Sequence, residues 1–292
     1  MRRIAPGLGI SLSAAAALAV AAVDWTPAAA ASATQSARTA STAAQLAGVN
    51  NFSCKPTAAH PRPVVLVHGT FATMGEFVAL APRLARAGYC VFALNYGCQN
   101  GQQLVCATAP IEDSALQLAA FVDRVLAATG AAQVDLVGHS QGGMMPRQYL
   151  KFLGGATRVH ELIGLAPSNH GTTLDGLKAL VAAIPGGSTL CDACQEQLAG
   201  SAFLAELNAG GDTVPEVQYT VIETRYDEVV TPYTSAFLSG PSVTNVLLQD
   251  ACPPDLTGHA AIVVDPNAIG WVLHALDPTS PAPACFPFGL PL

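Results

Sequence analysis

The stretch VDLVGHSQGG, from Val134 to Gly143, decides how the rest of the chain is organised. A short apolar run leads into G-x-S-x-G at 138–142, and MMPRQYL at 144–150 is typical of a helix. A serine on such a tight strand-to-helix turn is held out for attack, and the glycines give the backbone room to turn sharply. The pattern predicts a nucleophile elbow at Ser140. Its alternative is a surface turn that contains two glycines.

The composition suits a compact enzyme and excludes several other classes of protein. Of the 292 residues, 51% are hydrophobic and 11% are charged, which excludes a disordered chain and leaves ample material for a buried core. The formal net charge is −7, and no basic run is present. We therefore expect no nucleic-acid partner.

Residues 1–33 have the three parts of a secretory signal peptide. A basic start is followed by an apolar stretch from Leu8 to Val23 and by AxA-like small residues near 31–33. The alternative is a membrane anchor, but the apolar run is short for a span of ~20 residues and Asp24 interrupts it. We expect a secreted mature chain without a transmembrane segment.

Eight cysteines follow this segment, and an even number in an exported chain indicates disulfides. They lie at positions 54, 90, 98, 106, 191, 194, 252 and 285. Closeness along the chain suggests Cys98 with Cys106 and Cys191 with Cys194, while the residues alone leave the other pairings open. The C-x-x-C at 191–194 could instead be a redox or zinc motif. No second C-x-x-C accompanies it, so we expect no metal.

Strands alternate with helices along the rest of the chain. Apolar runs predict strands, and apolar residues three and four apart predict helices. The expected strands are 63–67, 89–94, 134–137, 159–167, 219–224 and 245–249, and the expected helices are 74–87, 111–129, 144–150, 195–207 and 266–276. This alternation predicts an α/β fold, with a central, mostly parallel sheet and helices on both faces.

Two long segments are expected at the rim of the site. The loop at 95–109 is long for a connection and carries two cysteines. The insertion at 168–215 contains the apolar segment 174–184, which is either a lid or acyl-pocket wall or an ordinary packed helix. We see no internal repeat and no second domain. The expected organisation is an arm or linker at 34–60 and one catalytic domain at 61–292.

A serine hydroxyl is a poor nucleophile at neutral pH, so it needs a histidine to take its proton and an acid to orient that histidine. The expected chain order is serine, acid, histidine. His259 lies in a loop before the last helix, whereas His274 lies inside that helix, so His259 is the predicted base. Asp227 follows the strand at 219–224 and is the predicted acid, with Asp250 as the alternative.

An acyl-transfer site also needs donors for the oxyanion of the tetrahedral intermediate. The amide after the nucleophile belongs to Gln141, and the loop after the first strand supplies Thr70, whose hydroxyl adds a further donor. We expect His68 and His139 to tighten these loops by hydrogen bonds rather than to react. His170 is expected to be structural, with a place in the pocket wall as the alternative.

Four stretches of the chain resemble the secreted class 2 bacterial triacylglycerol lipases and, more distantly, the fungal lipase B type. They are HGTF at 68–71, GHSQGG at 138–143, YDEVVTP at 226–232 and CPPDLTGHAAIVVDP at 252–266. The resemblance runs from about Cys54 to the C-terminus. It implies an α/β-hydrolase fold and lipase or esterase activity on acylglycerols or other acyl esters, at a lipid–water interface for a lipase and without a cofactor.

The resemblance further implies the roles given above to Ser140, Asp227, His259, Thr70 and Gln141. It also implies the disulfides Cys54–Cys90 and, as the remainder, Cys252–Cys285. The predicted function is a secreted serine carboxylic-ester hydrolase. The alternatives are an acyltransferase or polyester hydrolase with the same triad, and a secreted binding protein without catalysis.

Overall fold

In a computed structural model of the chain, the described residues are 46, 48–98, 104–173, 175, 176, 178 and 191–289. The predicted signal peptide at 1–33 lies outside them, as does most of the apolar segment at 174–184. Among the described residues, no helix has the length and apolar character needed to cross a membrane.

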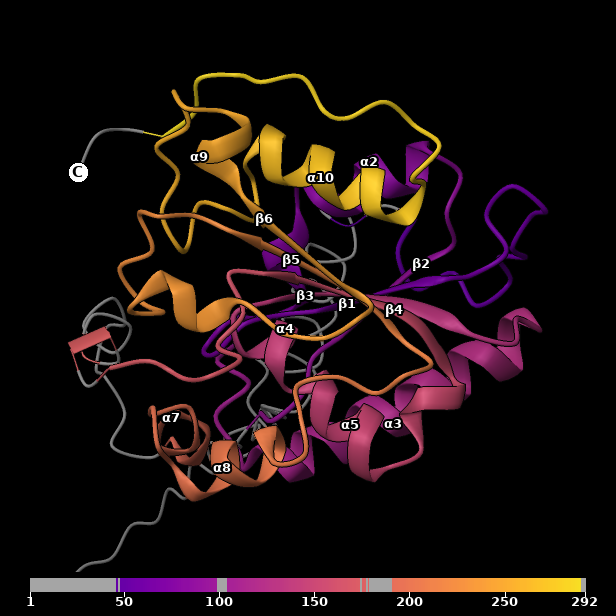
Figure 1. Cartoon of the computed structure of the whole chain (residues 1–292). Helices are drawn as coiled ribbons and strands as arrows, with labels where there is room; N and C mark the ends of the chain where they lie inside the picture. The colour runs from indigo at the N-terminus through magenta and orange to yellow at the C-terminus, as the bar shows by residue number, and fades with distance from the viewer. Residues whose placement is uncertain are drawn as a thin grey trace, which may run out of the picture. The chain divides into compact units, whose positions relative to one another are not determined.

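Six parallel strands form one sheet in the order β2-β1-β3-β4-β5-β6 (Figure 1). They are β1 (Val64–Val67), β2 (Val91–Leu94), β3 (Val134–His139), β4 (Val159–Leu165), β5 (Gln218–Glu223) and β6 (Val243–Leu247). Strands β1, β2 and β3 are buried throughout, as expected for apolar runs with helices on both faces. The predicted parallel α/β sheet is therefore confirmed.

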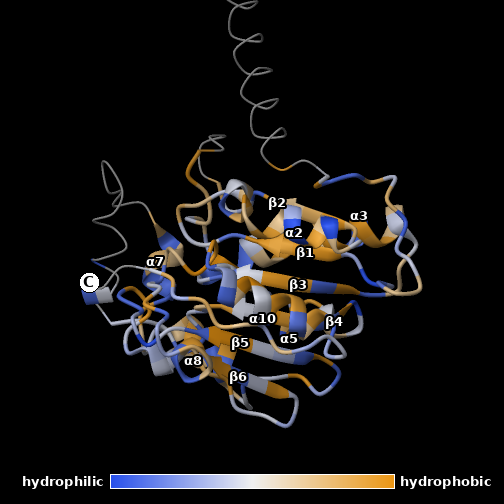
Figure 2. Ribbon diagram, turned by 90° about the horizontal axis from the view of Figure 1, so that it is seen from above, coloured by the Kyte–Doolittle hydropathy of each residue, from blue (hydrophilic) through white to orange (hydrophobic). Residues whose placement is uncertain are grey.

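Helices cover the sheet on both sides (Figure 1). They are α2 (Leu80–Arg86), α3 (Ile111–Thr129), α4 (Gln141–Met144), α5 (Pro146–Phe152), α7 (Asp192–Glu196), α8 (Ala202–Asn208), α9 (Leu248–Ala251) and α10 (Pro266–Leu276), with 3₁₀ turns η1 (Met74–Phe77), η2 (Gly155–Thr157) and η3 (Tyr233–Ala236). Apolar residues of α3, α5 and α8 pack in one core, and those of α2 and α10 pack in a second. The strands lie between these layers (Figure 1), and Figure 2 shows them from above as largely hydrophobic strands side by side.

Two expected helices are each divided in two. The segment 74–87 forms η1 and α2 because Pro82 lacks an N–H and its ring would clash with a preceding helical turn, so the proline is accommodated only in the first turn of α2. The segment 195–207 is α7 and α8, separated at Gly200, which has φ +83°. Ser201 caps the second helix by accepting from the Leu204 N–H.

Four disulfides join all eight cysteines in the predicted pairs. They are Cys54–Cys90, Cys98–Cys106, Cys191–Cys194 and Cys252–Cys285. Both thiols of the C-x-x-C motif are therefore used in one bond. No cluster of three His, Cys, Asp or Glu residues within the described ranges has the arrangement of a metal site.

The arm before the first strand contacts the edge of the sheet through Asn50. Its backbone N–H donates to the Val91 carbonyl at 3.0 Å. Its side chain accepts from the Ala93 N–H at 3.0 Å and donates to the Ala93 carbonyl at 2.8 Å. Asn50 thus hydrogen bonds with β2 much as a neighbouring strand would.

Candidate active site

Ser140 lies on the sharp turn between β3 and α4, at the carboxyl edge of the sheet. Its φ is +55° and its ψ is −124°, a strained conformation for a residue other than glycine. A Cβ on Gly138 would overlap the Gly142 carbonyl, and one on Gly142 would overlap the Val67 carbonyl, so both positions require glycine. The strand, turn and helix expected from G-x-S-x-G are all present.

His259 and Asp227 form a buried pair. The Nδ1 atom of His259 lies 2.8 Å from Oδ2 of Asp227, and both side chains are almost fully buried. The Asp227 Oδ1 atom accepts from the Val229 and Val230 amides at 2.8 and 2.7 Å. The neighbouring Glu228 accepts from the His259 N–H at 3.0 Å. Because a carboxylate can only accept, Nδ1 carries a proton, and in the neutral ring Nε2 offers its lone pair.

The His259–Asp227 pair lies against the nucleophile elbow, which is the turn that carries Ser140. His139, which directly precedes Ser140, has its Nε2 atom 3.0 Å from the His259 carbonyl, and the two imidazole rings are 4.8 Å apart between centroids. The Nε2 atom of His259 is buried and makes no hydrogen bond to any residue of the described ranges. A base with a free nitrogen is therefore held beside the serine turn.

A second imidazole–carboxylate pair, the buried His139 with the largely buried Glu76, lies beside the first. His139 Nδ1 lies 2.8 Å from Glu76 Oε1, and Glu76 Oε2 accepts from the Gly69 N–H at 3.0 Å. Burial alone would lower the pKa of His139, but the charge and hydrogen bond of Glu76 outweigh it and raise that pKa. Burial would likewise raise the pKa of Glu76, yet His139 holds it below its usual value. Both His139 nitrogens face acceptors, which an imidazolium satisfies.

Glu223 is a buried acid at the end of β5 that lies near Asp227. It is 0% exposed, and its Oε1 atom accepts from the Thr224 N–H at 2.7 Å. Burial, together with the negative charge of Asp227, raises the pKa of Glu223 well above its usual value. Both effects favour the protonated form of Glu223.

Thr70, on the loop after β1, and Gln141, the first residue of α4, flank the serine. Gly69, next to Thr70, is so close that a Cβ on it would come within 3.2 Å of the Ser140 Cβ. Within the part of the chain that the structure describes, no hydrogen bond uses the backbone N–H of Thr70 or of Gln141. These two amides are available to a negatively charged oxygen near Ser140.

The Gln141 side chain is directed away from this role and into the protein. Its Oε1 atom accepts from the Tyr96 hydroxyl at 3.1 Å, and its Nε2 atom donates to the Ala107 carbonyl at 3.2 Å. Tyr96 also donates to the His68 carbonyl at 2.6 Å. The side chain thus ties the elbow to the disulfide loop at 95–109.

His68 and His170 make structural contacts. His68 Nδ1 contacts the Gly69 carbonyl at 2.9 Å, and burial lowers the pKa of His68. His170 contacts the Ser235 carbonyl at 3.0 Å and Asp212 at 3.1 Å.

Asp250 and His274, the alternative acid and base, both lie away from the His259–Asp227 pair. Asp250 forms an exposed ion pair with Arg225 at 2.8 Å. His274 lies on α10, where its Nδ1 atom is 3.4 Å from the Ser280 hydroxyl. The structure therefore pairs His259 with Asp227 and not with Asp250.

Sequence reasoning overlooked Glu76, Glu223 and Gln197, which is described below. Glu76 had one signal, since it is the sole acidic residue between positions 74 and 87. Glu223 ends a strand otherwise rich in apolar residues. Glu76 and Gln197 contact residues on distant segments, and the burial of Glu223 depends on the complete fold, so the sequence alone could not identify them.

The model of one known family, described as Lipase (class 2), matches residues 61–272. The chain belongs to the class 2 lipases. A triacylglycerol lipase of Vibrio cholerae serotype O1 (strain ATCC 39315 / El Tor Inaba N16961) is 40% identical over 86 residues, which make up 28% of this chain and 25% of that protein. This class 2 lipase thus spans about a quarter of the length of that relative.

Solved structures of other lipases share the fold of this class 2 lipase. Aspergillus fumigatus lipase B superposes with a TM-score of 0.63 at 25% identity, over 76% of this chain and 53% of that one. The mature form of Bacillus licheniformis lipase BlEst2 superposes with a TM-score of 0.59 at 17% identity, over 76% of this chain and 94% of that one. The expected α/β-hydrolase fold is therefore confirmed.

Proposed function

We propose that this class 2 lipase is a serine carboxylic-ester hydrolase that acts on triacylglycerols through an acyl-enzyme on Ser140. The observation that carries the proposal is the buried His259–Asp227 pair, with 2.8 Å between Nδ1 and Oδ2, held against the strained serine turn. This is the arrangement that activates a serine hydroxyl for acyl transfer.

Each proposed step uses a group described above. His259 Nε2 takes the Ser140 hydroxyl proton while Oγ attacks the ester carbonyl carbon, and Asp227 stabilises the resulting imidazolium. The oxyanion accepts hydrogen bonds from the Thr70 and Gln141 amides and from the Thr70 hydroxyl. Collapse of the tetrahedral intermediate releases the alcohol, which takes the proton from His259. The acyl group stays on Ser140 as the acyl-enzyme. A water then repeats the sequence and releases the carboxylic acid.

The charges around the pair suit this cycle. The raised pKa of Glu223 disfavours a second negative charge beside Asp227, the carboxylate that faces His259 Nδ1. The His139–Glu76 pair has no net charge and anchors both the elbow and the Gly69 loop. Reaction at Ser140 therefore creates its imidazolium in contact with the Asp227 carboxylate, which stabilises it.

The wider assignments belong to the same proposal. The proposed organisation is that of an exported enzyme. It has a signal peptide at 1–33, an arm at 34–60 and a catalytic domain at 61–292, with a rim insertion at 168–215. Four disulfides support export because they persist in oxidising compartments. The Vibrio relative named triacylglycerol lipase supports acylglycerols as the substrate, which the enzyme would meet at a lipid–water interface.

Hydrolysis of p-nitrophenyl esters of increasing chain length tests the proposal. The wild-type protein is expected to hydrolyse them, and Ser140→Ala is expected to retain less than roughly one part in 10⁵ of kcat. Mass spectrometry of protein quenched during turnover should detect an acyl group on wild type and none on the variant. Equal inactivity of both proteins at all chain lengths would overturn the hydrolase assignment.

A further inference from the structure

The side chain of Gln197 joins the Thr70 loop to the segment that carries the C-x-x-C disulfide. It is 3% exposed, and all its polar atoms are used. Nε2 lies 3.0 Å from Thr70 Oγ1 and 3.0 Å from the Ala193 carbonyl, and Oε1 lies 2.8 Å from the Ser168 hydroxyl. Gln197 thus links its own segment to two others, at Thr70 and at Ser168.

Hydrogen-bond chemistry fixes the direction of the Gln197–Thr70 contact. The Ala193 carbonyl can only accept, so the Gln197 atom facing it must be the amide nitrogen. The same nitrogen faces Thr70, whose Oγ1 must therefore accept as well. The Thr70 hydroxyl keeps its own proton, and no acceptor within the described ranges takes it. That O–H is free for a ligand oxygen.

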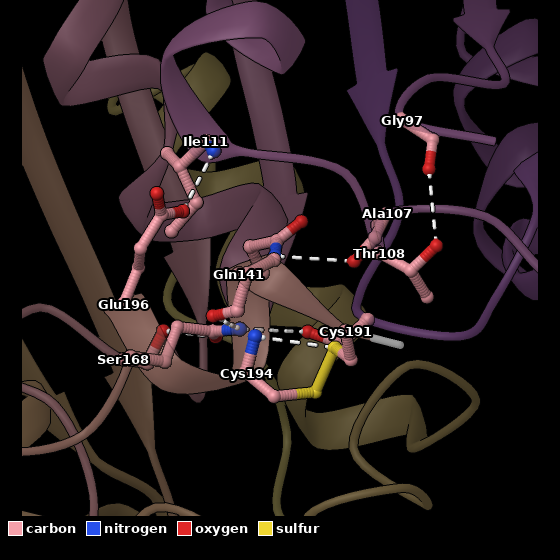
Figure 3. Close-up of a disulfide and its surroundings, with 12 residues drawn as sticks. Gly97, Ala107, Thr108, Ile111, Gln141, Ser168, Cys191, Cys194 and Glu196 are labelled. Atoms are coloured by element: carbon pink, nitrogen blue, oxygen red, sulfur yellow. Dashed lines mark hydrogen bonds between the residues drawn. A yellow bond between two sulfur atoms is a disulfide. The ribbon is translucent and has the colours of Figure 1, made fainter. Parts of the chain in front are cut away.

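The segment that holds Gln197 is fixed independently of Thr70 (Figure 3). The Cys191–Cys194 disulfide spans the start of α7, and the Cys194 N–H donates to the Cys191 sulfur at 3.1 Å. Glu196 accepts from the Ile111 N–H at 2.8 Å, which anchors α7 to the start of α3. The amide of Gln197 is therefore presented to Thr70 from a rigid support.

We propose that Gln197 is a positioning residue for ester hydrolysis: by donating to Thr70 Oγ1, it directs the threonine O–H toward the developing oxyanion. This inference rests on the oxyanion role proposed above for Thr70. It gives the C-x-x-C disulfide a function in the reaction, which is to hold the turn that carries Gln197. Pre-orientation of a donor matters because a hydroxyl that must rotate during the reaction stabilises the transition state less.

The test is a double-mutant cycle with steady-state kinetics on a p-nitrophenyl ester. Thr70→Val removes the hydroxyl and keeps the shape, so kcat should fall roughly 10²-fold, whereas Thr70→Ser should retain most activity. Gln197→Glu places an acceptor where the donor was and captures the Thr70 proton, so kcat should fall by a similar factor, with KM within about threefold. Gln197→Met frees the hydroxyl to rotate and should cost roughly tenfold or less.

The cycle separates the two proposals. In the Thr70→Val background, Gln197→Met should lower kcat no further, because its effect passes through the hydroxyl. If Gln197→Met costs the same factor with and without that hydroxyl, or if Gln197→Glu retains kcat, the positioning role is wrong. If Thr70→Val itself leaves kcat unchanged, the hydroxyl has no oxyanion role and the inference fails with it. Should Gln197→Glu not fold, Gln197→Met and Thr70→Val still complete the cycle.

Discussion

A histidine–aspartate pair lies near each end of β3. The two pairs have similar nitrogen–oxygen distances but different surroundings. At the carboxyl end, His259 Nδ1 lies 2.8 Å from Asp227 Oδ2, and both side chains are almost fully buried. At the amino end, His160 Nδ1 is 3.0 Å from Asp135, but His160 is 37% exposed. Arg62 also binds both oxygens of Asp135 at 3.0 Å. Similar pairs thus have different surroundings.

The amino end has a cavity but no nucleophile on a strained turn. Its volume is about 410 Å³, and its walls include His160, Glu161, Trp271 and His274. Burial raises the pKa of Glu161 to about 7. The carboxyl end differs by the strained turn at Ser140 and by the Thr70 and Gln141 amides, which make no hydrogen bond within the described residues. The proposed catalytic role of the His259–Asp227 pair depends on this difference.

Replacing histidines at the two ends should give the largest difference in kcat. His259→Ala is expected to lower kcat roughly 10⁵- to 10⁶-fold, because no other group can take the serine proton. His160→Ala and His274→Ala should change kcat less than about threefold. Ester hydrolysis measures all three, and near-normal turnover by His259→Ala would move the base elsewhere.

Replacing the two aspartates should separate orientation from stability. Asp227→Asn presents an amide to His259 Nδ1 and favours the wrong tautomer, so kcat should fall roughly 10⁴-fold. Asp135→Asn weakens contacts with Arg62 and His160, so it should cost about 1–3 kcal/mol of unfolding free energy and leave kcat within a few-fold. Kinetics and urea unfolding on both variants test this. Similar kinetic losses would contradict the comparison.

The buried pair behind the elbow should matter chiefly for stability. Glu76→Gln leaves His139 without its counter-charge and should lower the unfolding free energy by about 3 kcal/mol. Asp250→Asn removes only an exposed ion pair and should cost less than about 0.5 kcal/mol. Denaturant unfolding at pH 6 measures both. Equal losses of unfolding free energy in the two variants would show that the surroundings of the His139–Glu76 pair add nothing to its stabilising effect.

The pH dependence of the Glu76 effect has a definite sign. The raised pKa of His139 stabilises the fold below about pH 6.5, and this contribution is lost as pH rises through the folded value. The lowered pKa of Glu76 stabilises the fold above about pH 4.5, and this contribution is lost as pH falls through the folded value. The difference between wild type and Glu76→Gln should therefore be largest between about pH 5 and 6.5.

A further pH effect is expected at Asp265, which caps α10. Burial raises the pKa of Asp265 to about 7, so the folded state holds a proton that the unfolded state releases. Wild-type stability should therefore fall as pH rises from about 4 to 7, by less than about 4 kcal/mol from this group. Asp265→Asn retains a capping side chain and should flatten this decline. An unchanged slope in denaturant titrations would contradict the raised pKa.

The sequence predicted what depends on local pattern. The six apolar runs located the six strands, although Leu248 and Gln249 of the last run begin α9 instead. Gly138 and Gly142 identified the turn because their lack of a side chain is required there. The helix at 74–87 was less predictable, since the position of Pro82 had to outweigh a continuous apolar periodicity. Helix lengths depended on such single residues.

The supporting contacts of the site could not be predicted in the same way. Gln197 contacts Thr70 across 127 positions of sequence, and Glu76 contacts His139 across 63. Nothing in the local pattern distinguishes these residues from other polar residues on loops and short helices. Their roles depend on packing between distant segments, which the sequence specifies only through the complete fold.

The three hydrogen bonds of Asn50 have a consequence for the solubility of the folded protein. Strand β2 is an edge of the sheet, and an edge strand that exposes unpaired amides can join the edge of another molecule. Asn50 occupies the Val91 carbonyl and both polar backbone groups of Ala93, and the Cys54–Cys90 bond keeps the arm nearby. The arm therefore protects a chain rich in apolar residues from edge-to-edge aggregation.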